Sequence, residues 1–382
     1  MPERIDTHRR IGIFVLYDEN GIVDNYVEVL LKDMLTVLQE LIIVVNGSIS
    51  DVGYQKLRKI THKMYIRRNI GYDGGAYKDV FVEFLSEEEL KKWDEVVLFN
   101  DTFYGPFFPW KETFEKMEKE MVDYWGLSRF PEGNYFPNGK GIPEHIQAYF
   151  LVCRKPLFLS NAWREFWITL EYPKTYQEAI ENFEIRFTQY FSGKGYRNMA
   201  FMDQGKVNIT NSENPTMWCF ETLICNHCFP IIKRKVFCLI HLDVAKKTID
   251  YIRDNTGYNI NLITGHLERL YRENRIQPLT PFEPEELYLF YKKHKRIFIY
   301  GHGIYGKGIA RYFEYKNWKY DGFIVTENKE NNVNLLVYHR MRFNLNDGII
   351  LALGESAFQE VYSVVKKDLD EKQLYYPRVF SS

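Results

Sequence analysis

The chain has 382 residues, 45% of them apolar and 26% charged, and its 50 basic and 51 acidic side chains leave a formal net charge of −1. This composition is typical of folded globular proteins, predicts about two domains, and excludes collagen-like and disordered chains. No apolar run approaches the ~18 residues that span a bilayer, and the polar N-terminus lacks the apolar core of a signal peptide. We therefore expect a cytoplasmic protein with reduced cysteines, and the balanced charge gives no reason to expect a nucleic-acid partner.

The first hundred residues alternate short apolar runs with amphipathic segments. Strands are predicted at residues 11–17, 41–45, 64–67 and 96–99, and helices at 22–38 and 76–85. Alternation of this kind, with short connections, predicts an α/β fold in which helices flank a mostly parallel sheet. Ligands of such sheets bind where the strands end, so functional side chains are expected directly after each strand.

The pattern is less regular after residue 99. We predict a strand at 122–127, a loop rich in proline and glycine at 130–144, an alternating segment at 145–152, helices at 157–170 and 176–191, and a helical pair at 244–273. Pro278, Pro281 and Pro284 indicate a linker, and a new strand begins at Arg296. The expected organisation is a domain at 1–243, a helical connector at 244–284 and a small second domain at 285–382.

The densest motif runs from Asn69 through Gly71, Asp73, Gly74 and Gly75, between a strand and a helix. Glycine lets the backbone approach a ligand closely, and the free N–H groups at the start of the following helix attract phosphate. Asp73 is placed to accept a hydrogen bond from a sugar or ribose hydroxyl. The alternative is a tight turn in which Asp73 caps the helix.

A second motif, Asn100-Asp101-Thr102, follows the strand at 96–99. A carboxylate at this edge is suited to a divalent cation, because Mg²⁺ in proteins takes one or two carboxylates together with phosphate oxygens and water. The alternative is an Asx turn ahead of Gly105-Pro106.

Five segments in this order resemble the rhamnan synthesis protein F family of bacterial glycosyltransferases, over roughly residues 9–240. They are NIGYDGGAY (69–77), VVLFNDTFYGP (96–106), YWGLS (124–128), HIQAYFLV (145–152) and FPIIKR (229–234). The resemblance implies a GT-A-like, nucleotide-sugar-binding fold with dTDP-L-rhamnose as the donor. We expect the donor to contact Asn69, Gly71, Asp73, Gly74, Gly75, Asn100, Asp101, Lys233 and Arg234.

The resemblance also implies an acceptor and a metal. The acceptor is a growing cell-surface polysaccharide or a polyprenyl-linked glycan at the cytoplasmic face of the membrane, which adds a peripheral membrane contact. Related enzymes hold Mg²⁺ or Mn²⁺ with a DxD motif, where this chain has Asn100-Asp101-Thr102. Asp101 is therefore the expected metal ligand, with one carboxylate in place of two.

Sugar transfer from a nucleotide donor expels a diphosphate, and negative charge grows on its oxygens in the transition state. A metal at Asp101, the glycine loop, or the cations Lys233 and Arg234 are suited to stabilise that charge. Inversion at the anomeric carbon also requires a base that deprotonates the acceptor hydroxyl. The candidates for this base are Glu184, Glu221, Asp123 and His145.

Glu184 is the expected base and Glu221 the second candidate. Ile180, Phe187 and Phe191 flank Glu184 at helical spacing, so this acid is predicted at the margin of an apolar face, where partial burial would raise its pKa. The segment that begins at Glu184 is also similar to the stretch that carries the base in related family 2 transferases. The alternative is a solvated helix acid.

Three polar residues alternate along the segment 145–152, and we expect His145, Gln147 and Tyr149 to line the acceptor groove. A structural role for His145 is the alternative. The basic stretch from Lys56 to Arg68 is either a solvated helix face or a surface that attracts phosphates or an anionic membrane.

Cys225, His227 and Cys228 offer three soft metal ligands in four residues. Structural zinc usually needs a second pair of this kind, so buried thiols are expected instead.

The C-terminal segment carries Gly301, Gly303 and Gly306 between a predicted strand and a helix, and Glu327 follows about 20 residues later. This spacing is typical of dinucleotide-binding folds and predicts a small Rossmann-like α/β domain. It keeps open an NAD(P)-dependent oxidoreductase of sugar nucleotides. A catalytically silent glycan-binding or scaffold subunit is the third possibility.

Overall fold

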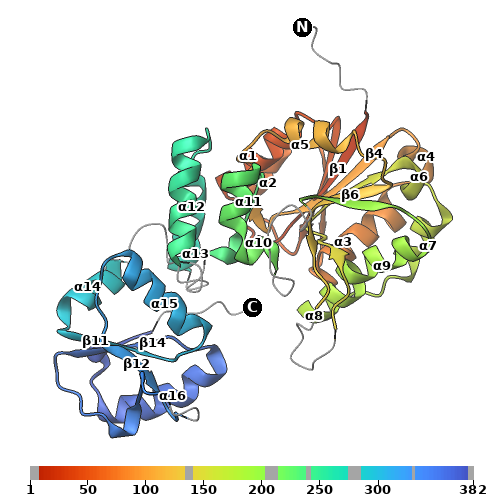
Figure 1. Cartoon of the computed structure of the whole chain (residues 1–382). Coiled ribbons are helices and arrows are strands. Elements are labelled where there is room, and N and C mark those ends of the chain that lie inside the picture. The colour runs from red at the N-terminus through yellow and green to blue at the C-terminus, as the bar shows by residue number, and fades with distance from the viewer. Residues whose placement is uncertain are drawn as a thin grey trace. The chain divides into compact units, whose positions relative to one another are not determined.

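The computed structural model describes residues 8–133, 141–202, 214–237, 242–273, 285–328 and 332–376. The chain divides into two compact units, residues 1–234 and 235–382 (Figure 1). Residues 134–140 of the loop predicted at 130–144 and the whole proline linker at 278–284 lie outside the described residues.

The first unit is built on an eight-stranded sheet in the order β3-β2-β1-β4-β8-β6-β7, with β9 paired to β6. Its strands are β1 (Arg10–Leu16), β2 (Glu40–Asn46), β3 (Lys63–Arg67), β4 (Glu95–Asn100), β6 (Tyr124–Phe130), β7 (His145–Ile146), β8 (Phe150–Arg154) and β9 (Asn198–Met202). Every strand of the sheet except β7 and β8 runs in the same direction. A separate ribbon pairs β5 (Phe103–Tyr104) with β10 (Ile232–Lys233). The predicted α/β fold with a mostly parallel sheet is confirmed.

Helices surround this sheet. They are α1 (Asn25–Met34), α2 (Asp51–Arg58), α3 (Tyr72–Asp79), α4 (Glu87–Leu90), α5 (Trp110–Met117), α6 (Lys155–Phe158), α7 (Asn161–Thr169), α8 (Tyr176–Ala179), α9 (Arg186–Gly193), α10 (Pro215–Trp218) and α11 (Phe220–His227), with π-helical turns η1 (Val80–Phe84) and η2 (Ile180–Ile185) and a 3₁₀ turn η4 (Arg234–Val236). The helix predicted at 176–191 is therefore interrupted by η2, and the segment at 145–152 is two strands joined by a turn.

The two faces of the sheet are covered by different helices (Figure 1). On one face, side chains of α3, α7 and α9 pack against Ile13, Val15 and Leu98 in a core rich in aromatic rings. On the other face, Trp110 of α5 stacks on Phe150 of β8 with ring centroids 4.8 Å apart. Each fully buried large apolar side chain stabilises the fold by about 1.5–3 kcal/mol, so the sheet that carries the site is firmly anchored.

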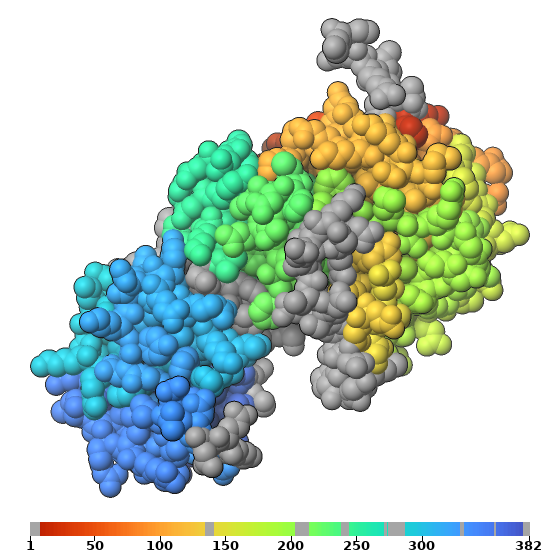
Figure 2. All heavy atoms as spheres, in the orientation of Figure 1, coloured from red at the N-terminus to blue at the C-terminus, as the bar shows by residue number. Residues whose placement is uncertain are grey.

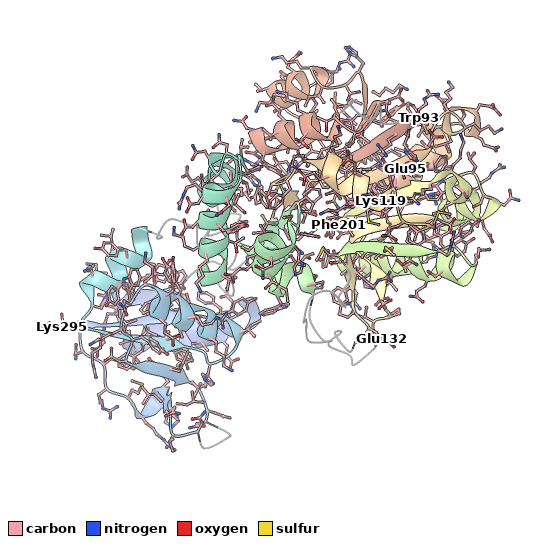
Figure 3. All side chains as sticks on the ribbon, turned by 45° about the horizontal axis from the view of Figure 1, so that its top comes forward. Trp93, Glu95, Lys119, Glu132, Phe201 and Lys295 are labelled. Atoms are coloured by element: carbon pink, nitrogen blue, oxygen red, sulfur yellow. The ribbon has the colours of Figure 1, made fainter. Side chains whose placement is uncertain are left out.

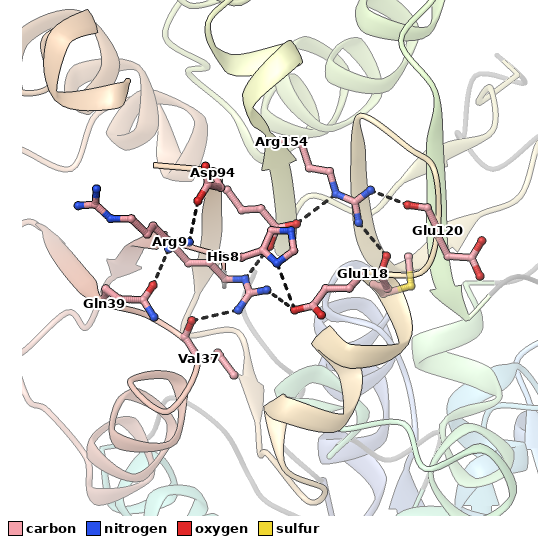
Figure 4. A network of polar contacts seen from close by, with 11 residues as sticks. His8, Arg9, Val37, Gln39, Asp94, Glu118, Glu120 and Arg154 are labelled. Carbon is pink, nitrogen blue, oxygen red and sulfur yellow. Dashed lines mark hydrogen bonds and ion pairs between the residues drawn. The ribbon is translucent and has the colours of Figure 1, made fainter. Parts of the chain in front are cut away.

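A buried ion network ties together the amino ends of the central strands (Figure 4). Arg10 Nε of β1 donates to Glu95 Oε2 of β4 at 2.6 Å, and Arg154 Nε donates to Glu95 Oε1 at 3.1 Å. Arg10 Nη2 also donates to Glu118 Oε1 at 2.5 Å. Figure 3 labels Glu95, the first residue of β4, and Trp93, which lies two residues ahead of that strand. The network lies at the amino edge of the sheet, opposite the carboxyl edge where ligands of parallel sheets bind.

The second unit contains a wholly parallel sheet in the order β13-β12-β11-β14-β15. Its strands are β11 (Arg296–Tyr300), β12 (Gly322–Val325), β13 (Leu335–Val337), β14 (Asp347–Leu351) and β15 (Leu374–Tyr375). Its helices are α12 (Leu242–Asn255), α13 (Asn261–Arg272), α14 (Glu285–Lys293), α15 (Ile304–Tyr315) and α16 (Glu355–Asp368), with 3₁₀ turns η6 (Tyr338–Arg340) and η7 (Glu371–Gln373). The described residues of 285–328 and 332–376 form one packed body (Figure 2). The predicted C-terminal α/β sheet is confirmed.

The glycine loop of this unit is explained by close packing. Gly301 has φ 109°, and a Cβ on Gly306 would come within 1.8 Å of the Gly301 carbonyl oxygen, so α15 begins directly against the end of β11. A cavity of about 510 Å³ lies beyond β12 and is lined in part by Glu327, Asn328 and Arg340. Among the described helices, none combines the length and apolar composition that crossing a bilayer requires.

Candidate functional site

The glycine motif and the strand-end motif meet at the carboxyl edge of the first sheet. Asn100 Nδ2 at the end of β4 donates to Asp73 Oδ2 in the first turn of α3 at 2.6 Å. Asn100 Oδ1 accepts from the backbone N–H and the hydroxyl of Thr102 at 3.1 and 2.6 Å. The Asx-turn interpretation of Asn100 is therefore correct, whereas Asp73 does not cap the helix. The amide of Asn100 fixes the carboxylate of Asp73 in place.

Asp101 is held by a cation and a phenol. Arg234 Nη1 lies 3.0 Å from Asp101 Oδ2 and donates to the Tyr26 hydroxyl at 2.8 Å. The Tyr26 hydroxyl in turn donates to the backbone carbonyl of Asp101 at 3.2 Å. Burial raises the pKa of Asp101 and the neighbouring Asp18 adds to the rise, while Arg234 opposes it.

Lys233 brings a second positive charge to the same edge. The pairing of β10 with β5 sets Lys233 opposite Phe103, and Lys233 Nζ donates to Thr102 Oγ1 at 2.6 Å. The ammonium group also lies over the ring of Tyr149, 4.1 Å from its centroid. A residue 131 positions away from Thr102 is thus fixed beside the strand-end motif.

Glu184 lies on the π-helical turn η2 and is held by residues of the β7 segment. Glu184 Oε1 is 3.3 Å from His145 Nε2, and Glu184 Oε2 accepts from the backbone N–H of Ala148 at 2.9 Å. The side chain of His145 is 1% exposed and that of Glu184 is 23% exposed. The carboxylate is consequently oriented by its partners while solvent still reaches it.

Gln147 and Tyr149 form a separate polar pair nearby. Ser128 Oγ of β6 donates to Gln147 Oε1 at 2.8 Å and lies 2.7 Å from the Tyr149 hydroxyl. Since Ser128 has a single hydroxyl proton, Tyr149 is the donor in the second bond. His145, Gln147 and Tyr149 are therefore alternate residues of one segment, but His145 contacts different partners from the other two.

The pKa values of two acids at this edge move in opposite directions. Burial and the charge of Asp101 raise the pKa of Asp73 to about 6, against the opposing effects of Asn100 and Lys233. Burial also acts to raise the pKa of Glu184, but His145, the Ala148 N–H and Lys233 outweigh it and leave the pKa lowered. The expectation that burial would raise the pKa of Glu184 was wrong, because it did not include these partners.

The glycines of the first motif make room for helix and loop side chains. A Cβ on Gly74 would lie 2.8 Å from Phe183 Cγ, and a Cβ on Gly75 would lie 2.9 Å from Tyr172 Cδ1. Gly71 has φ 80°, which favours glycine at the start of α3. Packing against η2 and Tyr172 therefore requires these glycines whether or not a ligand is bound.

The family described as rhamnan synthesis protein F matches residues 41–344, which is more than half of the chain. The chain belongs to this family. The match contains all five segments on which the sequence resemblance was based, and it extends past residue 240 into the second unit. Membership supports the expectation of an enzyme that transfers sugars.

Curated relatives and solved structures are more distant. An uncharacterized protein, y4gN, of Sinorhizobium fredii (strain NBRC 101917 / NGR234) is 21% identical over 49% of this chain and 46% of its own length. The chain spans less than half the length of the curated relatives it matches. The 4-diphosphocytidyl-2C-methyl-D-erythritol synthase of Anaerococcus prevotii DSM 20548 is 11% identical, with a TM-score of 0.34 over 51% of this chain and 89% of that chain.

A second solved structure is glucosyl-3-phosphoglycerate synthase of Mycobacterium tuberculosis, in complex with Mn²⁺, UDP-glucose and phosphoglyceric acid. It is 13% identical, with a TM-score of 0.23 over 39% of this chain and 58% of that chain. TM-scores this low do not assign a fold to the chain. The fold is described from the chain's own strand order.

The remaining predicted site residues lie elsewhere. Asn69 is exposed ahead of α3. Glu221 lies in the first turn of α11, where its charge adds to the burial that raises the pKa of the Cys225 thiol. Asp123 accepts from the Arg197 backbone N–H at 2.7 Å, at the start of β6. Of the four acid–base candidates, Glu184 and His145 are the two that the structure brings together.

Some contributors were not singled out from the sequence. Tyr26 accepts from Arg234, and Thr102, although it lies in the motif Asn100-Asp101-Thr102, was not expected to bind Lys233. Asn46, at the end of β2, donates to the Tyr72 carbonyl at 3.2 Å and accepts from Arg67 Nη1 at 2.6 Å, which supports the start of α3. The position of Asn46 directly after a buried strand was the available signal.

Among the described residues, few side chains at this edge are available as ligands for a divalent cation. Asp101 is already paired with Arg234, and its neighbour Asn100 contributes an amide that is bonded to Asp73 and Thr102. Across the described ranges, no three His, Cys, Asp or Glu side chains are grouped as a metal site requires. One carboxylate is a partial fit, because Mg²⁺ and Mn²⁺ sites also recruit phosphate oxygens and water.

Proposed function

We propose that the first unit is an inverting glycosyltransferase that moves L-rhamnose from dTDP-L-rhamnose onto a growing cell-surface polysaccharide or a polyprenyl-linked glycan. The observation that carries the proposal is the convergence of Lys233, Asp73 and Glu184 at the carboxyl edge of one sheet. The electrostatic interactions of Lys233 with both acids link all three groups. Membership of the rhamnan synthesis protein F family supports the choice of rhamnose.

The donor diphosphate would lie against the positive groups of this edge. Lys233 and Arg234 are the cations suited to its charge, and backbone N–H groups at the start of α3 add to them. Charge on the departing diphosphate grows in the transition state, so fixed cations lower the barrier. Asp73 and Asn100 are proposed to contact sugar or ribose hydroxyls, with Asn69 and Gly71 just ahead of α3 and Gly74 and Gly75 in its first turn.

Glu184 is the proposed base. Its lowered pKa keeps it ionised at neutral pH, and its carboxylate is partly exposed. The acceptor hydroxyl would give its proton to Glu184 as the acceptor oxygen bonds to the anomeric carbon. Gln147 and Tyr149 are proposed to line the acceptor groove, on the same segment as the His145 that contacts Glu184. Acceptors of this kind place the enzyme at the cytoplasmic face of the membrane, in peripheral contact with it.

A divalent cation is proposed only as an addition to these groups. Asp101 would hold Mg²⁺ or Mn²⁺ jointly with donor phosphate oxygens, where the ion would supply positive charge to the leaving group. Because Lys233 and Arg234 remain, we expect a chelator to reduce turnover without abolishing it.

A donor screen tests the proposal. The full chain is incubated with dTDP-L-rhamnose, other sugar nucleotides and a lipid-linked acceptor, with Mn²⁺ or with chelator, and nucleoside diphosphate release and product anomer are measured. We expect release from dTDP-L-rhamnose, its loss in Glu184→Gln, and its retention in the matched variant Glu221→Gln. Loss in Glu221→Gln alone would move the base to α11.

The same protein distinguishes the oxidoreductase alternative. Ligand binding to the native state raises the unfolding temperature by mass action. We expect dTDP to raise it and NADH to leave it unchanged. A rise with NADH alone would favour the cavity beyond β12 as the working site. Normal cellular function of Asp101→Ala and Glu184→Ala would favour a silent scaffold.

A further inference from the structure

His145 is fixed on both sides of its ring. It begins β7, is 1% exposed, and stacks on Phe130 with ring centroids 5.2 Å apart and planes 11° apart. His145 Nδ1 lies 2.8 Å from the carbonyl oxygen of Pro143. A carbonyl only accepts, so Nδ1 carries a proton. Nε2 faces Glu184 and donates to its carboxylate when it carries a second proton, which makes the ring an imidazolium.

The outward nitrogen of His145 meets Glu184. Nε2 lies 3.3 Å from Glu184 Oε1, while the other carboxylate oxygen accepts from the Ala148 N–H at 2.9 Å. The Ile146 N–H also donates to Thr188 Oγ1 at 3.0 Å, which ties the same short segment to the start of α9. Both oxygens of Glu184 are therefore oriented by residues 145–148.

We infer that His145 is a positioning residue for Glu184, which aims the carboxylate at the acceptor hydroxyl and controls when it is free to accept a proton. This inference rests on the proposed function and deepens it. It replaces an acceptor contact by His145 with a role that acts through Glu184. The π-helical turn η2 agrees with it, since such turns inside helices are frequent at functional sites.

The charges around Glu184 come from several elements. His145 of β7 and Lys233 of β10 favour its ionised form. Asp73 of α3 and the phenol of Tyr149 interact with Glu184 as well, and ionised Glu184 raises the pKa of both. Removing the imidazole leaves burial and the Asp73 charge opposed by the Ala148 N–H and Lys233 alone, so the pKa of Glu184 should rise.

The chemical step balances with these groups alone. The acceptor oxygen forms a bond to the anomeric carbon, and the bond from that carbon to the diphosphate breaks, with its electron pair leaving on the diphosphate. The acceptor proton moves to the Glu184 carboxylate. His145 keeps its Nδ1 proton on the Pro143 carbonyl oxygen throughout and, as an imidazolium, donates from Nε2 to Glu184.

The test compares His145→Gln with the exposed control His62→Gln in the transfer assay. We expect kcat of His145→Gln to fall about 10- to 100-fold with KM within about twofold of the parent, and the acidic limb of its pH–rate profile to move to higher pH. His62→Gln should match the parent. An unchanged acidic limb in an active His145→Gln enzyme would overturn the inference.

A measurement on the unaltered protein covers the case in which His145→Gln does not fold. Imidazole nitrogen NMR of the parent should show His145 with protons on both Nδ1 and Nε2, and an Nε2 resonance that shifts in Glu184→Gln. An Nε2 without a proton would contradict the positioning role, because it cannot donate to the carboxylate. If the parent transfers no sugar from any nucleotide donor, the proposed function fails and this inference fails with it; transfer with a normal His145→Gln profile removes the inference alone.

Discussion

The side-chain amide of Asn100 donates to the carboxylate of Asp73 at 2.6 Å and joins two segments that are 27 residues apart in the chain. One segment ends β4 and the other begins α3, so the bond fixes the junction at the carboxyl edge of the sheet. The side-chain amide of Asn100 therefore holds the Asp73 carboxylate in one orientation.

Replacing Asn100 by Asp should destabilise this junction. The variant places a second carboxylate against Asp73, so a donor is lost and two like charges meet. We expect a loss of about 1–3 kcal/mol in the free energy of unfolding at pH 7.5 by urea titration. Millimolar Mn²⁺ should restore part of it. The matched change Asn69→Asp, at an exposed position of the same motif, should have little effect; equal losses in both variants would contradict this account.

The glycine motif makes a prediction about packing. In Gly74→Ala the new methyl would meet the ring of Phe183 at 2.8 Å, and overpacking of this kind costs about 1–3 kcal/mol. Gly193→Ala is the control, because a Cβ at that position of α9 meets no atom within 4 Å. Thermal unfolding should show a lower midpoint for Gly74→Ala and an unchanged or higher one for Gly193→Ala. An unchanged unfolding midpoint for Gly74→Ala would show that Phe183 of η2 does not pack tightly against Gly74 of α3.

Asp73 should make stability depend on pH in a defined direction. Its pKa is about 6 in the folded chain and near 3.8 when unfolded, so the folded state binds more protons between these values and stability falls as pH rises through them. Asp73→Asn removes this cost. We expect the variant to be more stable by about 1–2 kcal/mol at pH 7.5, after allowance for partial exposure of the side chain, and to gain little at pH 4. A gain of the same size at both pH values would assign the effect to something other than ionisation.

The ion network at the opposite edge predicts a large and purely structural effect. Glu95 is 1% exposed and bonds to both Arg10 and Arg154, so Glu95→Ala leaves two guanidinium groups without their shared partner. Breaking a buried pair costs about 3–5 kcal/mol. Glu88→Ala, in the exposed pair with Lys91, should unfold like the parent. A small effect of Glu95→Ala would mean that water replaces the carboxylate.

Much of the fold and the place of the site followed from the sequence. Buried apolar runs followed by Asn46 and Asn100 locate strand ends, and strand ends in a parallel sheet share one edge. Contacts between residues far apart in the chain could not be predicted from the sequence. The sequence around Gly74 and Gly75 does not indicate that these glycines pack against Phe183 and Tyr172, which follow about a hundred residues later.

The chemistry of single residues was harder to predict than their location. Glu184 was expected to have a raised pKa because its apolar neighbours are visible in the sequence, whereas the turn that brings His145 and Ala148 to its carboxylate is not. Likewise, the sequence indicates that Asp101 is a metal ligand, because it does not show that the pairing of β10 with β5 brings Arg234 to this carboxylate. Electrostatic partners supplied by distant strands decide such cases.

Binding of dTDP to Lys233→Ala is the most direct test of where the donor lies. Lys119→Ala, an exposed lysine of the same unit, is the control. A lost charge-assisted bond is worth about 1.5–3 kcal/mol, so calorimetric titration should show dTDP affinity at least about tenfold weaker in Lys233→Ala and unchanged in Lys119→Ala. Equal dTDP affinity in the parent and Lys233→Ala would contradict the placement of the nucleotide-sugar at this edge of the sheet.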